Sequence, residues 1–104
     1  MAEIKIKDYE FERSREANEE NESVIWAENN GWEVRKMEYV RRRGCADRFF
    51  FGYGVIVPIE FKRPGKEPDV HQAKDHARLA EVGVKVHVCR SLTEVQAMLR
   101  KHMR

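Results

Sequence analysis

The sequence predicts an α/β domain whose elements follow the order helix, strand, strand, strand, helix, strand, helix. Stretches that are rich in helix-favouring residues alternate with short apolar runs that are typical of strands. The expected strands cover residues 32–40, 47–51, 55–63 and 84–89, and the expected helices cover residues 15–30, 69–82 and a last stretch from residue 91. A chain of 104 residues has room for one small domain and for no second module.

Each expected helix begins or ends at a residue that suits the position. Gly31 is a natural stop for the first helix, and Gly83 is one for the second. Asp69 is a good N-terminal cap for the second helix, and Ser91 with Glu94 has the spacing of a capping box before the third. The third helix has one apolar stripe, made of Leu92, Val95, Met98 and Leu99.

The first residues of the chain differ from the rest in their pattern. Apolar side chains alternate there with polar ones, which fits a short strand or an extended arm. These apolar residues are Ile4, Ile6, Tyr9 and Phe11. We therefore divide the chain into an N-terminal arm, residues 1–14, and a single domain, residues 15–104. So short a domain leaves the arm little to cover, and we expect the arm to pack against a second copy of the chain.

Three charged residues stand in the two apolar runs around residues 47–63. The pair Tyr53-Gly54 is typical of a two-residue hairpin turn, and counting outward from it sets Asp47 opposite Glu60, with Cβ atoms about 5 Å apart. Two such carboxylates repel each other unless a cation lies between them, and oxygen ligands suit Mg²⁺ or Mn²⁺. Lys62 lies on the same face of its strand as Glu60. The alternative is a set of solvated charges on an edge strand.

Charge is distributed unevenly along the chain. The formal net charge of +2 is too small to indicate nucleic-acid binding by itself. Residues 8–33 are acidic by comparison with the rest, whereas basic residues gather at Arg41, Arg42, Arg43, Arg100, Lys101 and Arg104. The arginine run lies just before Asp47, so it is well placed to hold phosphates, although a solvated loop would have the same composition.

Cysteine usage and hydropathy indicate in which cellular compartment the protein is expected. Cys45 and Cys89 lie in apolar surroundings, and neither has the spacing of a redox pair or of a zinc site. The four histidines follow no metal-binding pattern either. Neither a secretory leader nor a run of membrane-spanning length is found in the sequence. We therefore expect a soluble cytoplasmic protein without a membrane partner.

The charged residues of the hairpin and its surroundings resemble the VRR-NUC family of the PD-(D/E)xK nuclease superfamily. That family has Gly-x-x-Asp-Arg, a hairpin, apolar-Glu-apolar-Lys, Pro-Gly, and a Gln that opens the next helix. The matching residues are Gly44, Asp47, Arg48, Ile59, Glu60, Phe61, Lys62, Pro64, Gly65 and Gln72. The resemblance extends from Ala27 to Val88. It departs at Ala46, where the family usually has proline.

The resemblance implies a restriction-endonuclease-like αβββαβ core with a central mixed sheet, flanking helices and an additional C-terminal helix. It also implies a Mg²⁺-dependent endonuclease that hydrolyses DNA phosphodiester bonds, with Mn²⁺ able to substitute and no organic cofactor. Small members of the family resemble phage enzymes, form homodimers and can act on four-way junctions. For a phage protein, the compartment would be the cytoplasm of the host cell.

The resemblance also assigns roles to individual residues. Lys62 would orient the attacking water or stabilise the developing charge, and Gln72 would lie at the edge of the site. The implied metal ligands are Asp47, Glu60, the carbonyl of Phe61 and, from the first helix, Glu20, with Glu22 as the alternative. The expected contacts to nucleic acid are the arginine run Arg41, Arg42 and Arg43, from its position beside Asp47, together with Arg48 of the family motif. Two other readings stay open: a nucleic-acid-binding module without catalysis, and a nuclease subunit that acts only within a larger restriction or repair assembly.

Overall fold

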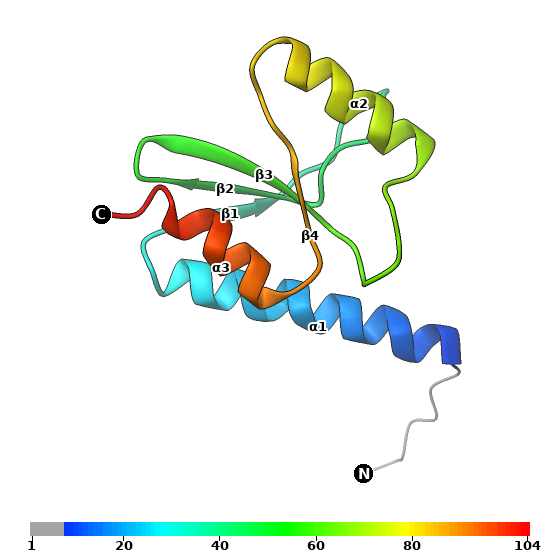
Figure 1. Cartoon of the computed structure of the whole chain (residues 1–104), viewed down its shortest axis with the longest axis horizontal. Coiled ribbons are helices and arrows are strands. Elements are labelled where there is room, and N and C mark those ends of the chain that lie inside the picture. Colours follow the sequence, from blue (N-terminus) through cyan, green and yellow to red (C-terminus); the bar gives the residue numbers. More distant parts are fainter. Residues whose placement is uncertain (1–7) are drawn as a thin grey trace.

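A computed structural model describes residues 8–104 of the chain and side chains from residue 18 onward (Figure 1). Its elements follow the predicted order. They are α1 (Asp8–Glu28), β1 (Glu33–Lys36), β2 (Arg48–Gly52), β3 (Val55–Phe61), α2 (Val70–Glu81), β4 (His87–Cys89) and α3 (Leu92–Arg100). Ile4 and Ile6 of the expected arm lie outside the described residues.

The four strands form one mixed sheet in the order β1-β2-β3-β4. β2 pairs antiparallel with both β1 and β3, whereas β4 pairs parallel with β3. The turn between β2 and β3 is made by Tyr53 and Gly54, with φ of 51° and 79°. Positive φ at both positions is what a two-residue type I′ turn requires. The pairs Gly52 with Val55 and Arg48 with Ile59 confirm the predicted register.

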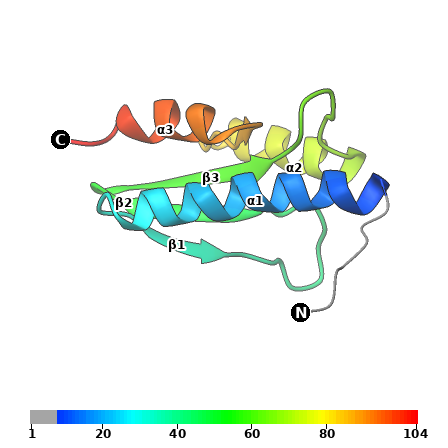
Figure 2. The ribbon, with the colours of Figure 1, turned by 90° about the horizontal axis from the view of Figure 1, so that it is seen from below.

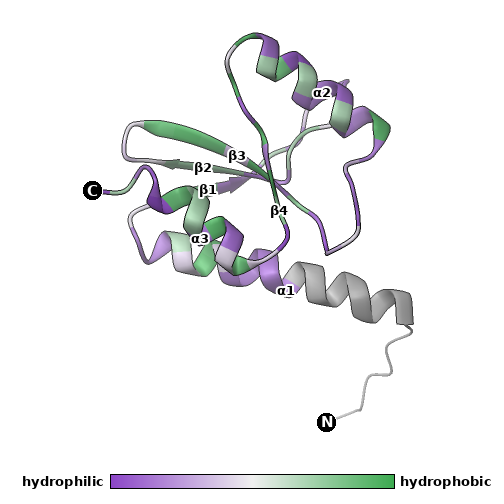
Figure 3. Ribbon diagram, viewed as in Figure 1, coloured by the Kyte–Doolittle hydropathy of each residue, from purple (hydrophilic) through white to green (hydrophobic). Residues whose placement is uncertain are grey.

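Helices lie on both sides of the sheet. α1 and α3 run side by side on one side of it, and α2 lies on the other side (Figures 1 and 2). The fully buried side chains of Phe50 and Ile59 belong to the same hydrophobic core as Ala27 of α1 and Leu99 of α3. β2 and β3 are correspondingly coloured hydrophobic along much of their length in Figure 3. The predicted α/β class with a mixed sheet and flanking helices is therefore confirmed.

Three element boundaries differ from the expected ones by more than two residues. α1 begins at Asp8 and not at Arg15, because the residues in between include glutamate and arginine, which favour helix over a short alternating strand. β1 ends at Lys36, where the chain leaves the sheet for a loop of residues 37–46. β4 begins only at His87, because the backbone N–H of Val84 still donates to the Leu79 carbonyl, at 2.9 Å, in the closing turn of α2.

Among residues 8–104, no helix combines the length and the apolar character needed to cross a bilayer.

Candidate functional site

Asp47 stands directly before β2 and faces β3. Its Oδ2 accepts a hydrogen bond from the backbone N–H of Phe61 at 2.7 Å. The loop before it packs against α2 at Gly44, where φ is +94° and a side chain would collide with the backbone carbonyl of His71. Only glycine combines this conformation with so close an approach. The register of the hairpin and the contact with α2 together place the Asp47 carboxylate beside Glu60.

Glu60 is the buried centre of the site. Its residue exposure is 0%, and burial together with the charge of Asp47 raises its pKa to about 7, against the opposing charge of Lys62. Oε2 accepts a hydrogen bond from the side-chain amide of Gln72 and lies 3.4 Å from Nζ of Lys62. Oε1 is buried without a hydrogen-bond partner among the described residues. Such an oxygen is costly unless something else binds it.

The composition of this site suits a hard divalent cation. Mg²⁺ is usually held by one or two carboxylates and keeps other positions for water and phosphate oxygens. Asp47, directly before β2, and Glu60, on β3, supply two carboxylates, and the unpartnered Oε1 of Glu60 is an acceptor of the right kind. Within residues 18–104, no three acidic, histidine or cysteine side chains gather as a metal-binding group. The arrangement is therefore an open two-carboxylate site, to which the Phe61 carbonyl could add a ligand.

Gln72 connects the start of α2 to Glu60. Its backbone N–H donates to the cap residue Asp69 at 2.9 Å, and its Oε1 accepts from the Asp69 backbone at 3.0 Å. This capping box fixes the amide so that its Nε2 donates to Glu60. The resemblance put Gln72 at the edge of the site, and the structure brings it into direct contact with the buried carboxylate.

Glu20 of α1 and Arg48 of β2 bind each other. Nε of Arg48 donates to Oε2 of Glu20 at 2.6 Å, and their side chains are 20% and 16% exposed, respectively. The sequence analysis predicted that Glu20 is a metal ligand and that Arg48 contacts nucleic acid. In the structure, each is the partner of the other. The alternative residue Glu22 is exposed and lines a cleft, and the neighbouring Glu19 accepts from the backbone of Leu92 at 2.8 Å, at the start of α3.

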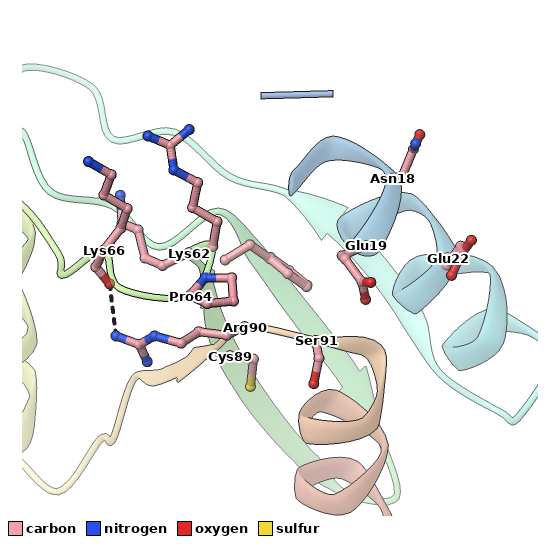
Figure 4. Close-up of a pocket in the computed structure, with 11 residues that line it drawn as sticks. Asn18, Glu19, Glu22, Lys62, Pro64, Lys66, Cys89, Arg90 and Ser91 are labelled. Atoms are coloured by element: carbon pink, nitrogen blue, oxygen red, sulfur yellow. Dashed lines mark hydrogen bonds between the residues drawn. The ribbon is translucent and has the colours of Figure 1, made fainter. Parts of the chain in front are cut away.

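Two clefts flank the site. One, of about 650 Å³, lies between α1 and the segment that follows β3, and Phe61 and Lys62 line it (Figure 4). The other, of about 830 Å³, is lined by Arg42, Arg43 and Gln72. Nη1 of Arg43 lies 3.3 Å from Nε2 of His71. All three arginines of the run are exposed beside the site, as a role in phosphate contact requires.

Two groups of residues near the site were not singled out from the sequence. Tyr39 donates to the buried carboxylate of Asp75 at 2.7 Å, which fastens the loop of residues 37–46 to α2. Burial raises the pKa of Tyr39, and the hydrogen bond to Asp75 raises it further by a smaller amount. The second group is a set of cations after β3 and β4: Arg63, Lys66 and Arg90. The sequence did contain a signal that Arg63 and Lys66 lie close together, because they flank Pro64-Gly65, and a turn at these two residues brings its flanking residues together.

A mixed sheet flanked by helices, with two carboxylates and a lysine brought together by the adjoining strands β2 and β3, defines a restriction-endonuclease-like α/β domain. No protein-family profile matches the chain, and no curated protein matches it. A solved structure described as a VRR_NUC domain does match, with a TM-score of 0.74 and 31% identity over 86% of this chain and 97% of that one. The chain belongs to the VRR-NUC family, and its domain is of the nuclease type.

Proposed function

We propose that the protein is a metal-dependent nuclease that hydrolyses phosphodiester bonds in DNA. The observation that carries the proposal is the state of Glu60, a buried carboxylate beside Asp47 with one oxygen unpartnered and its pKa raised to about 7. A purely structural role would leave that oxygen hydrogen-bonded. Membership in the VRR-NUC family supports the same conclusion.

Asp47, Glu60 and the carbonyl of Phe61 would hold Mg²⁺ or Mn²⁺. Such an ion polarises the scissile phosphate and lowers the pKa of a bound water. The Phe61 N–H keeps the Asp47 carboxylate in place, and the Gln72 amide does the same for Glu60. Because these carboxylates are oriented by the backbone and by a capped helix, little reorganisation is needed when substrate binds.

Lys62 would act on the reacting phosphate. Its ammonium group lies 3.4 Å from Glu60, and its side chain is 20% exposed and lines the cleft, so it is held by the carboxylate yet reachable by substrate. A preorganised cation in this position stabilises the negative charge that develops during hydrolysis, or orients the attacking water. Glu20 would contribute through water, since Arg48 already donates to its carboxylate.

The arginine run would bind the DNA backbone next to the site. Arg42 and Arg43 line the cleft that also contains Gln72, and Arg41 is exposed beside them. Arg48 would add a positive charge close to the reacting phosphate, with Glu20 holding its guanidinium in place. Phosphate contacts of this kind supply affinity without sequence preference.

We also propose a homodimer that acts on branched DNA such as four-way junctions. One sheet face carries the core residues of β2 and β3, and the opposite face presents Phe49 and Phe51, whose ring centroids are 6.5 Å apart, with Ile56 58% exposed. An apolar face of this kind supports association with a second copy. A two-fold dimer would present two sites to the strands of one junction.

A substrate and metal panel tests the proposed activity. The purified protein is incubated with supercoiled, linear, single-stranded and four-way-junction DNA, each with Mg²⁺, with Mn²⁺ or with EDTA. We expect cleavage with either metal ion and none with EDTA. Binding of DNA without cleavage under any of these conditions would instead identify a nucleic-acid-binding module, and would overturn the proposal for the isolated chain.

A further inference from the structure

We propose that the cleft between α1 and the segment after β3 is a second phosphate-binding groove, which holds the nucleic-acid backbone on the side of the site away from the arginine run. The inference rests on the proposed function and extends it to residues that the family pattern does not include. Lys62 lines the cleft and also contacts Glu60, so the groove opens directly from the site. A backbone that leaves Glu60 in this direction enters the groove.

A tight turn builds the basic wall of this groove. The backbone N–H of Lys66 donates to the Arg63 carbonyl at 3.1 Å, and Gly65 has φ of +82°. Proline followed by a glycine with positive φ is the arrangement of a type II turn, in which the first and last residues have Cα atoms within about 7 Å of each other. The turn therefore brings the cationic residues Arg63 and Lys66 together beside Lys62.

Arg90 joins the same wall from the end of β4. Its Nη2 donates to the Lys66 carbonyl at 2.8 Å and to the carboxylate of Glu67 at 3.0 Å. Both bonds come from one nitrogen, and a guanidinium has five N–H donors in a planar fork. Arg90 is thus held in position by the turn and keeps donors on its other nitrogens that can bind a phosphate.

The opposite wall of the cleft determines how many backbones it admits. Figure 4 shows Lys62, Lys66 and Arg90 on one side and the side chains of α1 on the other. The residues from α1 are Asn18, Glu19 and Glu22. Glu22 is exposed, and its carboxylate would repel a second phosphate backbone. The groove therefore takes one backbone, with its phosphates against the basic wall.

Salt-dependent binding tests the groove separately from catalysis. The variant Lys66→Ala with Arg90→Ala is compared with Arg78→Ala with Lys85→Ala, which removes one lysine and one arginine at exposed positions outside both clefts. Affinity for fluorescent single-stranded and duplex oligonucleotides is measured in EDTA over a range of salt concentrations. Each phosphate contact contributes about 0.9 to the slope of log K against log salt for duplex and about 0.7 for single strands.

For the groove variant Lys66→Ala with Arg90→Ala, we expect the slope to fall by the amount that one to two phosphate contacts contribute. For the control pair Arg78→Ala with Lys85→Ala, we expect the slope of the wild type. A larger fall with single strands identifies an unpaired strand in the groove, and a larger fall with duplex identifies one strand of a helix. A groove variant that behaves like the control pair overturns the inference. Because EDTA removes metal ions, this assay measures binding without cleavage. If the groove variant loses slope and the wild-type protein never cleaves DNA with Mg²⁺ or Mn²⁺, the phosphate-binding groove is supported and the nuclease activity is rejected.

Glu67→Gln gives a test that does not depend on removing a cation. The Glu67 side chain is 80% exposed, so the substitution leaves folding intact, and it removes the carboxylate that competes with a phosphate for Arg90. We expect tighter binding and a steeper salt dependence. Unchanged or weaker binding would contradict the assignment of Arg90 to the groove.

Discussion

Gln72, at the start of α2, donates a hydrogen bond to Glu60, on the third strand of the sheet. The same oxygen of Glu60 also lies 3.4 Å from Nζ of Lys62, while its other oxygen has no hydrogen-bond partner among the described residues. A carboxylate with one oxygen held by two partners and the other oxygen without a partner can bind a ligand such as a divalent cation through that second oxygen.

The raised pKa of Glu60 makes the stability of the metal-free protein depend on pH. Its pKa is about 7 in the folded protein and 4.5 as the ordinary value, so the folded state binds more protons between these limits. The contribution of Glu60 to the free energy of unfolding therefore falls by about 3 kcal/mol as pH rises from below 4.5 to above 7. Urea unfolding in EDTA at pH 5 and pH 8 measures this contribution as the difference between wild type and Glu60→Gln, because the lowered pKa values of His76 and His87 act in the opposite direction in both proteins.

Glu60→Gln should remove that fall, because the amide does not titrate. Glu81→Gln, at an exposed position on α2, is the matched control and should retain the pH dependence of the wild type. Equal pH dependence in Glu60→Gln and wild type would show that Glu60 ionises normally in the folded protein.

Asp47→Asn should abolish cleavage and leave DNA affinity within a few-fold of wild type. The substitution removes a proposed metal ligand, whereas the basic residues that bind phosphate are unchanged. Cleavage with Mg²⁺ and binding in EDTA are measured on the same preparation. Full activity of the purified variant would remove Asp47 from the site.

Lys62→Ala should lower the rate of cleavage on the order of 10²-fold or more, comparable to the loss of one preorganised electrostatic group. The rate is measured in single turnover at saturating DNA, so that weaker binding does not contribute. Lys85→Ala, which removes an exposed lysine outside both clefts, is the control. A wild-type rate would show that Lys62 only neutralises Glu60.

The triple variant Arg41→Ala, Arg42→Ala and Arg43→Ala should weaken binding to all DNA sequences. The slope of log K against log salt should fall by about one unit for each lost phosphate contact. The rate at saturating DNA should stay as in wild type, because none of these residues contacts Glu60. Unchanged affinity and slope would mean that the run is a solvated loop.

The hairpin was predictable from the sequence because its register depends on local chemistry. The positive φ of Tyr53 and Gly54 fixes a two-residue turn, and the turn alone sets which residues face each other. The N-terminal cap at Asp69 was also predictable, because it depends only on residues within the first turn of α2. The family resemblance placed Gln72 only at the edge of the site, and its contact with Glu60 could not be predicted from spacing, since that contact depends on how α2 lies against the sheet.

The pairing of Glu20 with Arg48 could not be predicted from the sequence. The two residues are 28 positions apart, and their contact depends on where α1 crosses the sheet. The same holds for Arg90, which reaches Lys66 across 24 positions. Propensity and periodicity describe one element at a time, whereas these contacts are set by the packing of whole elements.

Two copies of the chain should assemble through the sheet face of Phe49, Phe51 and Ile56. Ile56→Glu places a charge on that face, and Ile25→Glu places one on α1; the two isoleucines are 58% and 59% exposed, so both variants should fold. We expect wild type and Ile25→Glu to be dimers by light scattering at concentrations on the order of 10 µM, and Ile56→Glu to be a monomer.

Because a junction needs two sites on one scaffold, Ile56→Glu should lose junction cleavage more than nicking of simple duplex. A wild-type protein that is monomeric and still cleaves junctions would falsify the dimer. Dimers in both variants would instead move the interface away from this face, toward the N-terminal residues that include Ile4 and Ile6.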